Sequence, residues 1–158
     1  MTHPLSLRPA LPEDDGFLYA LYASTRAEEL DAWGLAGAQR EAFLRMQYLA
    51  QQQSYYAQLP RADHRVVVVD GAPAGRLLVE RREEEIRLAD VALLPEHRGR
   101  GLGTALVKQL LEEARAAGKP VRLHALTGGR AAALYARLGF GVLADEGPYV
   151  LMEWRPGG

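Results

Sequence analysis

A glycine-rich segment with interleaved positive charge lies at residues 95–104, PEHRGRGLGT. Glycines occupy alternate positions 99, 101 and 103, and arginines occupy positions 98 and 100. An apolar run precedes the segment and a helical pattern follows it. Glycines allow a positive φ and a close approach of the backbone, and the first amides of a helix attract anions. The pattern therefore predicts an anion-binding loop between a strand and a helix, rather than a tight turn with solvated arginines.

Two common phosphate-binding fingerprints fail on specific residues of this loop. A Walker A loop ends in Gly-Lys-Ser/Thr, whereas Thr104 follows Gly103 directly with no lysine between them. The dinucleotide pattern GxGxxG fails because the third glycine comes one residue early, at 103. The segment also lies in the middle of the chain, behind three consecutive expected strands, and not in an opening β-α-β unit.

A third pattern fits the loop. It resembles the [RQ]-x-x-G-x-[GA] motif of the GNAT superfamily of N-acetyltransferases, here Arg98-Gly99-Arg100-Gly101-Leu102-Gly103. The preceding DVALLPEHRG resembles the family's apolar strand with a proline before the loop. LYARLGF (134–140) resembles the family's later Y-x-x-x-G-F helix end. Together with the order of elements, the resemblance covers most of residues 64–154, while the first two helices match in position only.

This resemblance implies acetyl-CoA (coenzyme A) as the cosubstrate, with no metal. The loop amides would receive its pyrophosphate, and the end of the preceding strand would offer backbone groups to the pantetheine arm, as an added strand does. A bulky residue at 101 or 103 should block that approach, and Arg98 and Arg100 either contact phosphate or are solvated. The implied cofactor-binding residues are Leu93, Leu94, Arg98, Gly99, Arg100, Gly101, Leu102, Gly103, Thr104, Gly129, Arg130 and Tyr135.

The implied reaction is acetyl transfer to a primary amine of a small molecule or peptide, by direct attack through a tetrahedral intermediate. An alkylammonium is mostly charged at neutral pH, so a base, often acting through water, must take its proton. The oxyanion needs backbone donors and the leaving thiolate needs an acid. Tyr135 matches the position of the tyrosine that often serves as this acid in the family. The alternative is a packing tyrosine with its hydroxyl at the rim.

The general base stays open between two main candidates. On the strand expected at 86–94, Asp90 is the only charge on an apolar face, and burial there would raise its pKa. It is otherwise a carboxylate paired with an arginine or reaching solvent. His124 has a suitable unperturbed pKa, or is a hydrogen-bonded structural histidine. Glu80 and Glu85 are weaker candidates, because the stretch ERREEE is most simply a solvated hairpin tip.

Several other chemistries lack the residues they need. There is no cysteine, the histidines at 3, 64, 97 and 124 have no metal-ligand spacing, and HExxH is absent. No Gly-x-Ser-x-Gly elbow offers a serine nucleophile, so direct transfer without a covalent enzyme intermediate is the simpler mechanism. One departure from the family is Gly128, which stands where an asparagine often contacts the cofactor. Backbone amides of residues 128–130 would have to substitute for it.

Periodicity and turn signals, among them a hairpin turn at Asp70-Gly71 and a helix end at Gly118, predict the order β-α-α-β-β-β-α-β-α-β-β. The expected fold class is α/β (α+β), with a mixed, mostly antiparallel sheet of about seven strands flanked by about four helices. A β-α-β unit around residues 86–126 should add a parallel pair of strands through a right-handed crossover. The expected strands are 5–10, 64–70, 74–82, 86–94, 121–126, 140–145 and 149–154, and the expected helices are 17–30, 39–59, 102–117 and 130–138.

Length and composition place the chain among ordinary globular proteins. Its 158 residues predict one N-acetyltransferase domain over 1–158. A net charge of −1 gives no global field for nucleic acid or an anionic membrane. No apolar stretch approaches the ~20 residues that span a bilayer, and the N-terminus lacks the pattern of a signal peptide. The absence of cysteine is compatible with a reducing cytosol, so we expect a cytoplasmic protein.

The acceptor is the least defined part of the expectation. In this fold the first two helices and the last hairpin usually wall the acceptor site. Here the corresponding residues are 33–35, Tyr48, Tyr55, Tyr56 and the turn 145–149, while Glu28, Glu29 and Asp31 could attract a cationic amine. The alternative for each is an aromatic packed on the sheet or an acid on a solvated face.

A second class of function stays open beside catalysis. The chain could be a non-catalytic acyl-CoA-binding sensor or an interaction module of the same fold, and only an enzyme would release thiol when an amine is added. Homodimers are common in the family, and YVLMEW (149–154) could serve as an edge or shared strand. Nothing in the sequence fixes this association.

Overall fold

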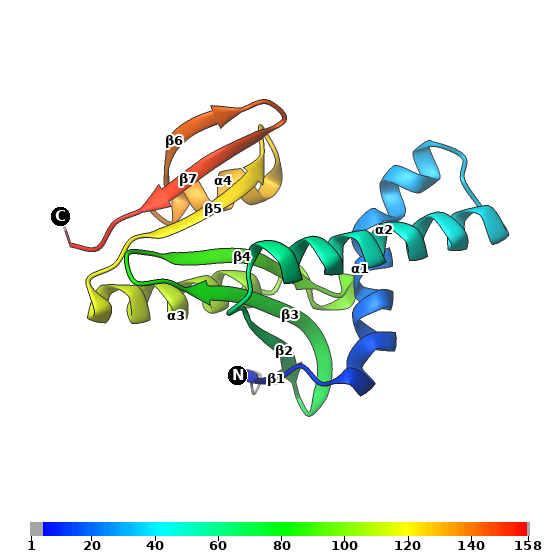
Figure 1. Ribbon diagram of the computed structural model, residues 1–158, viewed down its shortest axis with the longest axis horizontal. Coiled ribbons are helices and arrows are strands. Elements are labelled where there is room, and N and C mark those ends of the chain that lie inside the picture. Colours follow the sequence, from blue (N-terminus) through cyan, green and yellow to red (C-terminus); the bar gives the residue numbers. More distant parts are fainter. Residues whose placement is uncertain (1–4, 158) are drawn as a thin grey trace. The chain divides into compact units, whose positions relative to one another are not determined.

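The computed structural model describes residues 5–157, and the predicted order of strands and helices is confirmed there (Figure 1). Every predicted boundary lies within two residues of the observed one. His3 and the first residues of the N-terminal stretch lie outside the described part. The elements are β1 (Leu5–Pro9), α1 (Asp15–Ala32), α2 (Gly37–Gln58), β2 (Asp63–Val69), β3 (Ala72–Arg81), β4 (Ile86–Leu93), α3 (Leu102–Ala117), β5 (Val121–Leu126), α4 (Arg130–Arg137), β6 (Gly141–Glu146) and β7 (Tyr149–Trp154), with 3-10 turns η1 (Pro12–Asp14) and η2 (Pro95–His97).

The strands form a seven-stranded sheet in the order β1-β2-β3-β4-β5-β7-β6. The pairs β1–β2, β5–β7 and β6–β7 are antiparallel, whereas β4 and β5 are parallel. Parallel neighbours need a long crossover, which α3 supplies. The mixed, mostly antiparallel sheet and the parallel pair around residues 86–126 are therefore as the sequence predicted.

The chain packs as two compact units, and β3 and β4 pass through both. The first unit takes in the chain up to Leu78 together with Val91–Arg98. The second takes in Val79–Asp90 and the chain from Gly99 onward. A single domain over 1–158 stays a prediction.

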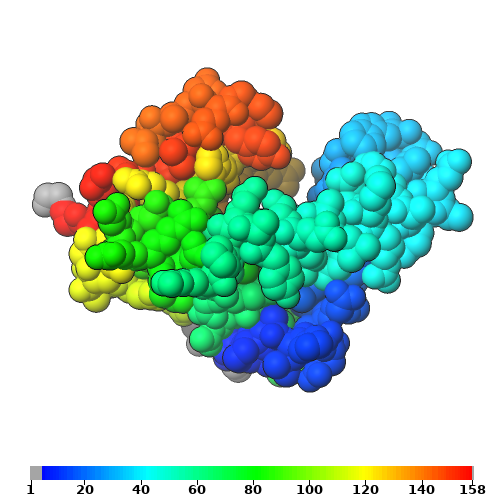
Figure 2. All heavy atoms as spheres, viewed as in Figure 1, coloured from blue at the N-terminus to red at the C-terminus, as the bar shows by residue number. Residues whose placement is uncertain are grey.

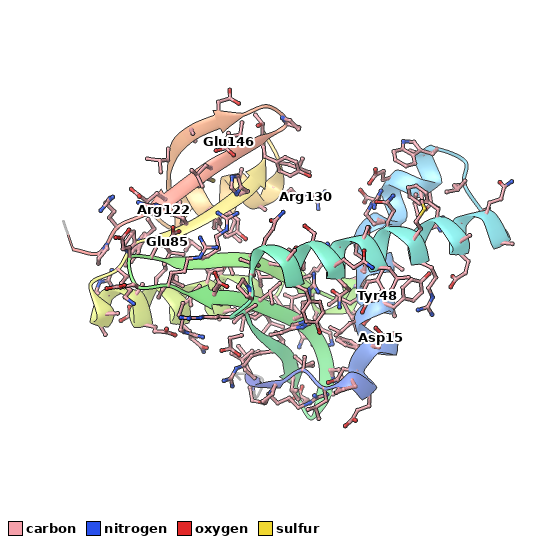
Figure 3. All side chains as sticks on the ribbon, viewed as in Figure 1. Asp15, Tyr48, Glu85, Arg122, Arg130 and Glu146 are labelled. Atoms are coloured by element: carbon pink, nitrogen blue, oxygen red, sulfur yellow. The ribbon has the colours of Figure 1, made fainter. Side chains whose placement is uncertain are left out.

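In the first unit, α1 and α2 form a helical hairpin with its own apolar cluster. Tyr19 and Tyr48 meet edge to face with ring centroids 5.5 Å apart, and the Tyr48 hydroxyl donates a 2.9 Å hydrogen bond to Asp15 (Figure 3). The cluster is completed by Leu18, Leu30 and Leu44. Burial, with the Asp15 contact, raises the pKa of Tyr48 above its ordinary value. In Figure 2, α2 runs across the view from cyan to blue-green.

The second unit is built around α3 and the last strands. The apolar spacing of α3 puts one face of the helix inside, and Gly118, at φ +69°, ends the helix as its sequence predicted. Side chains alternate along β5 and β7, so each strand contributes one buried face. The buried residues of α3, β5 and β7 are Leu102, Leu106, Val107, Leu110, Leu111, Ala114, Val121, Leu123, Ala125, Val150, Met152 and Trp154.

The pair of Arg8 and Asp14 closes the turn between β1 and α1 and generates a prediction about acid stability. Both guanidinium Nη atoms donate to the carboxylate, at 2.9 and 2.8 Å, and the Leu11 N–H donates to it at 2.8 Å. These bonds lower the pKa of Asp14 from 3.8 to about 2. The pair therefore contributes stability above about pH 4, and this contribution is lost as the pH falls toward 2.

We expect Asp14→Asn to lower the free energy of unfolding at pH 7 by about 1–3 kcal/mol, since it removes charge-assisted hydrogen bonds to a buried group. The difference from wild type should shrink as the pH falls from 4 to 2, which urea titrations at several pH values would measure. Glu13→Gln, an exposed change in the same turn, is the control and should have little effect. A difference that stays constant through the acid range would contradict this account.

Candidate functional site

The glycine loop forms the connection that its sequence predicted, between the end of β4 and the start of α3. Gly99 and Gly101 have φ values of +73° and +78°, which favour glycine over any other residue. Gly101 is the N-cap of α3, and its carbonyl accepts the first helical bond, from Ala105, at 3.0 Å. No side chain caps this end of the helix, so the amides of residues 102–104 point outward with no helical acceptor.

Arg98 turns back onto its own unit. Its Nε donates a 3.0 Å hydrogen bond to the Leu93 carbonyl, and its Nη2 lies 3.5 Å from the Ser24 hydroxyl on α1. The side chain therefore ties the loop to the end of β4. Arg100 is exposed at the loop itself.

The end of β4 offers a backbone edge. The Leu94 N–H already donates to the Ala74 carbonyl on β3 at 2.8 Å. Because N–H groups alternate between the two edges of a strand, the Leu93 N–H points to the opposite edge. β4 pairs with β5 on that edge at Ile86 and Arg87, at the start of the strand. Of the two residues proposed for the pantetheine arm, Leu93 is therefore the one with an amide directed outward.

Tyr135 lies on α4 and is buried, with 7% of its surface exposed. Its ring packs against Phe140 with centroids 5.5 Å apart, and its carbonyl accepts the Phe140 N–H at 3.0 Å. Gly139 makes this return possible with a φ of +103°. Burial raises the pKa of Tyr135 to about 12, and the negative charge of Asp90 adds to the rise. The structure thus brings two of the predicted catalytic residues within electrostatic range of each other.

Asp90 is half-buried on the face of β4 that also carries the buried Ile86 and Leu88. The apolar face expected from alternation is present at its beginning. The face is more exposed toward the end of the strand, where Ala92 and Leu94 are half-buried as well.

His124 has both ring nitrogens engaged on the exposed face of β5. Its Nε2 lies 2.8 Å from Glu146 on β6, and its Nδ1 receives a hydrogen bond from Arg87 on β4. An arginine can only donate, so Nδ1 is the acceptor and Nε2 carries the proton given to Glu146. This arrangement supports the structural alternative for His124 and leaves it no ring lone pair for an incoming amine.

The expectation of a solvated hairpin tip is wrong for Glu80. This residue is 5% exposed and pairs with Arg82 at 2.6 Å, because β3 continues to Arg81 and is buried without interruption from Ala74 to Glu80. Glu85 is also partly covered and lies 3.4 Å from Arg122. The two labelled residues are neighbours in Figure 3.

The start of α4 lacks the side chain that the family often has there. Gly128 has a φ of +75°, and the Gly129 N–H already donates to the Leu126 carbonyl at 3.1 Å. Arg130 begins the helix with an exposed side chain (Figure 3). Of the amides expected to replace the missing asparagine, that of Gly129 is thus committed to the turn.

The residues expected to wall the acceptor site differ in their surroundings: one is buried, two are in ion pairs and two line a cavity. Tyr48 was expected there wrongly, since it is 1% exposed inside the α1–α2 cluster. Two of the acids are engaged, Glu29 with Arg26 at 2.8 Å and Asp31 with Arg40 at 2.5 Å. Tyr55 and Tyr56 line a cavity of about 210 Å³ in the first unit. Its other lining residues are Ala10, Gln52, Leu59, Pro60, Ala62, His64, Arg76 and Leu78.

Two further kinds of functional feature are absent from residues 5–157. Three or more His, Asp or Glu side chains do not gather there in a way that could hold a metal ion. The helices of this part of the chain include none with both the length and the apolar character needed to cross a membrane.

Comparison with known proteins shows the family of the chain and supports its fold. The model of the acetyltransferase (GNAT) family matches residues 30–140. A PaiA N-acetyltransferase from Thermoplasma acidophilum, solved in complex with coenzyme A, is 17% identical, with a TM-score of 0.71 over 96% of this chain and 99% of that one. A Corynebacterium glutamicum protein described as histone acetyltransferase HPA2 and related acetyltransferase is 24% identical. Its TM-score is 0.68, over 98% of this chain and 97% of that one. The ribosomal-protein-S18-alanine N-acetyltransferase from Escherichia coli is 19% identical, with a TM-score of 0.62 over 98% of this chain and 96% of that one.

The conformation of Gly101 generates a prediction about stability. A Cβ at this position would meet no atom within 4 Å, so the cost of Gly101→Ala comes from the left-handed φ alone. We expect the free energy of unfolding to fall by about 1–2 kcal/mol, measured by urea titration. Gly16→Ala is the matched control, because Gly16 lies in α1 without a positive φ and a Cβ there also meets no atom within 4 Å. Equal losses in the two variants would contradict the conformational argument.

Proposed function

Because the chain belongs to the acetyltransferase (GNAT) family, we propose that it transfers an acetyl group from acetyl-CoA to a primary amine of a small molecule or peptide. The observation that carries the proposal is the loop at the start of α3, with its two positive-φ glycines and its uncapped helical amides. Such an end attracts a pyrophosphate through its amides and its partial positive charge. The PaiA relative, which has a similar fold, was solved with coenzyme A.

The loop and the end of β4 would bind different parts of the cofactor. The amides of residues 99–104 would hold the pyrophosphate, and the outward edge of Leu93 would pair with the pantetheine arm as a strand does. Arg98 would act mainly by holding the Leu93 carbonyl, which it contacts at 3.0 Å. Arg100 would reach toward phosphate, since its side chain is exposed at the loop and does not share the bond of Arg98 to the Leu93 carbonyl.

Transfer would proceed by attack of the neutral amine on the thioester carbonyl. The new C–N bond forms in a tetrahedral intermediate, and its collapse breaks the C–S bond. Asp90, directly or through water, would take the proton of the amine, and the Tyr135 hydroxyl would protonate the departing thiolate. Water can then carry the proton from Asp90 back to Tyr135, so both groups are restored.

The electrostatic interaction between Asp90 and Tyr135 supports the assignment of one as the base and the other as the acid. A charged Asp90 opposes ionisation of Tyr135, which keeps the hydroxyl protonated before transfer. Once Asp90 holds a proton, that opposition disappears and Tyr135 can give up its own proton more readily. Uptake of the amine proton and delivery of a proton to the thiolate therefore favour each other.

We expect Tyr135→Phe to lower kcat about 100-fold or more, the usual contribution of a general acid. Because the pKa of Tyr135 is raised to about 12, its hydroxyl stays protonated at ordinary assay pH, so the loss should be uniform between about pH 6 and 10. Tyr19→Phe, which removes another buried hydroxyl, is the matched control. Full turnover by Tyr135→Phe at every pH would exclude the acid role.

The proposed activity is tested by incubating acetyl-CoA with a panel of primary amines and measuring free thiol. We expect thiol release above background with at least one amine, and binding of acetyl-CoA in calorimetry. Binding without release for any amine would favour the alternative of an acyl-CoA sensor or interaction module. Absence of any calorimetric signal with acetyl-CoA would overturn the cofactor assignment.

A further inference from the structure

Gly75 lies on β3, next to the main chain of Ala92 and Leu93 on β4. A Cβ built on Gly75 would be 2.1 Å from the Ala92 carbonyl oxygen, 2.9 Å from Leu93 Cδ2 and 3.1 Å from Leu93 Cα. Real Cβ contacts essentially never fall below 3.0 Å, and here the nearest atom belongs to the backbone. The space of a side chain at position 75 is therefore occupied by β4 itself.

This contact shows that the Ala92 carbonyl leaves the plane of the sheet. In a regular ladder the carbonyls lie within the sheet and side chains leave it at right angles. An oxygen located where the Cβ of a neighbouring strand would be is turned toward one face. A backbone bond to β3 is present two residues later, where the Leu94 N–H donates to the Ala74 carbonyl at 2.8 Å. β4 is thus locally distorted at Ala92, at a glycine of its neighbour.

The distortion immediately precedes the peptide that would bind the cofactor arm. Leu93 follows Ala92, and the direction of its N–H depends on the orientation of that peptide. The Leu93 carbonyl is held separately by Arg98 Nε at 3.0 Å. Gly75 on one side and Arg98 on the other therefore fix the backbone of residues 92 and 93.

We propose that Gly75 is a positioning residue for acetyl-CoA. Its missing side chain lets the Ala92 carbonyl turn toward β3, and this sets the outward direction of the Leu93 N–H for the pantetheine arm. The inference rests on the proposed function. It concerns a residue outside the glycine loop, on a strand that makes no contact with the pyrophosphate in that proposal.

The test compares Gly75→Ala with Gly141→Ala. Gly141 is also a strand glycine, on β6, but a Cβ there would meet no atom within 4 Å. We expect Gly75→Ala to raise the calorimetric Kd for coenzyme A about tenfold or more, and to raise KM for acetyl-CoA far more than it lowers kcat. Gly141→Ala should leave both unchanged. Circular dichroism and thermal melting would establish that each variant is folded.

Ala92→Gly provides a second variant that introduces no clash. It keeps the carbonyl but loosens the backbone that carries it, so we expect a folded protein with a Kd for coenzyme A raised about threefold or more. This variant decides the question if Gly75→Ala does not fold.

The outcomes separate the inference from the function on which it rests. Failure of the wild type to bind coenzyme A overturns the proposed function, and the inference with it. Wild-type binding combined with an unchanged Kd in folded Gly75→Ala, even at a lower Tm, overturns the positioning role alone. So does an unchanged Kd in Ala92→Gly when Gly75→Ala is unfolded.

Discussion

The early end of the parallel pairing between β4 and β5 is the constraint on which the proposed site depends. The two strands pair at Ile86 and Arg87, so the amides of the later residues of β4 take no part in that ladder. A regular pair would have consumed the Leu93 N–H and left nothing for an added strand. The glycine loop follows that edge directly in the chain, so the same strand leads from the proposed arm site to the proposed pyrophosphate site.

The proposed chemistry depends on a second local constraint, the burial of Tyr135 near a charge. Burial alone keeps the hydroxyl protonated, which suits an acid but also makes it reluctant to give up its proton. Asp90 resolves this conflict if it takes the amine proton, because its neutralisation eases the ionisation of Tyr135. His124 could not play this part, since Arg87 and Glu146 already occupy its two nitrogens.

Local signals predicted the fold because each is written in a few adjacent residues. The Asp70-Gly71 turn, the Gly118 helix end and the period of α3 each depend on near neighbours, and all appear as expected. The environments of side chains depended on distant segments and were predicted less well. Glu80 lies in a charged stretch but faces inward, and Tyr48 lies in a helix whose buried face is set by α1. His124 could not be assigned without knowing that Arg87 and Glu146 flank it.

The glycines illustrate the same limit in physical terms. Gly101 and Gly139 are required by positive φ values, a property of the chain at that point, and both belong to motifs that the sequence displays. Gly75 is required by space, because the Ala92 carbonyl fills the position of its side chain. Nothing in PAGR shows this, since the atoms responsible are on another strand. A glycine inside a strand is the only signal the sequence offers, and its meaning becomes clear only from the strand that packs against it.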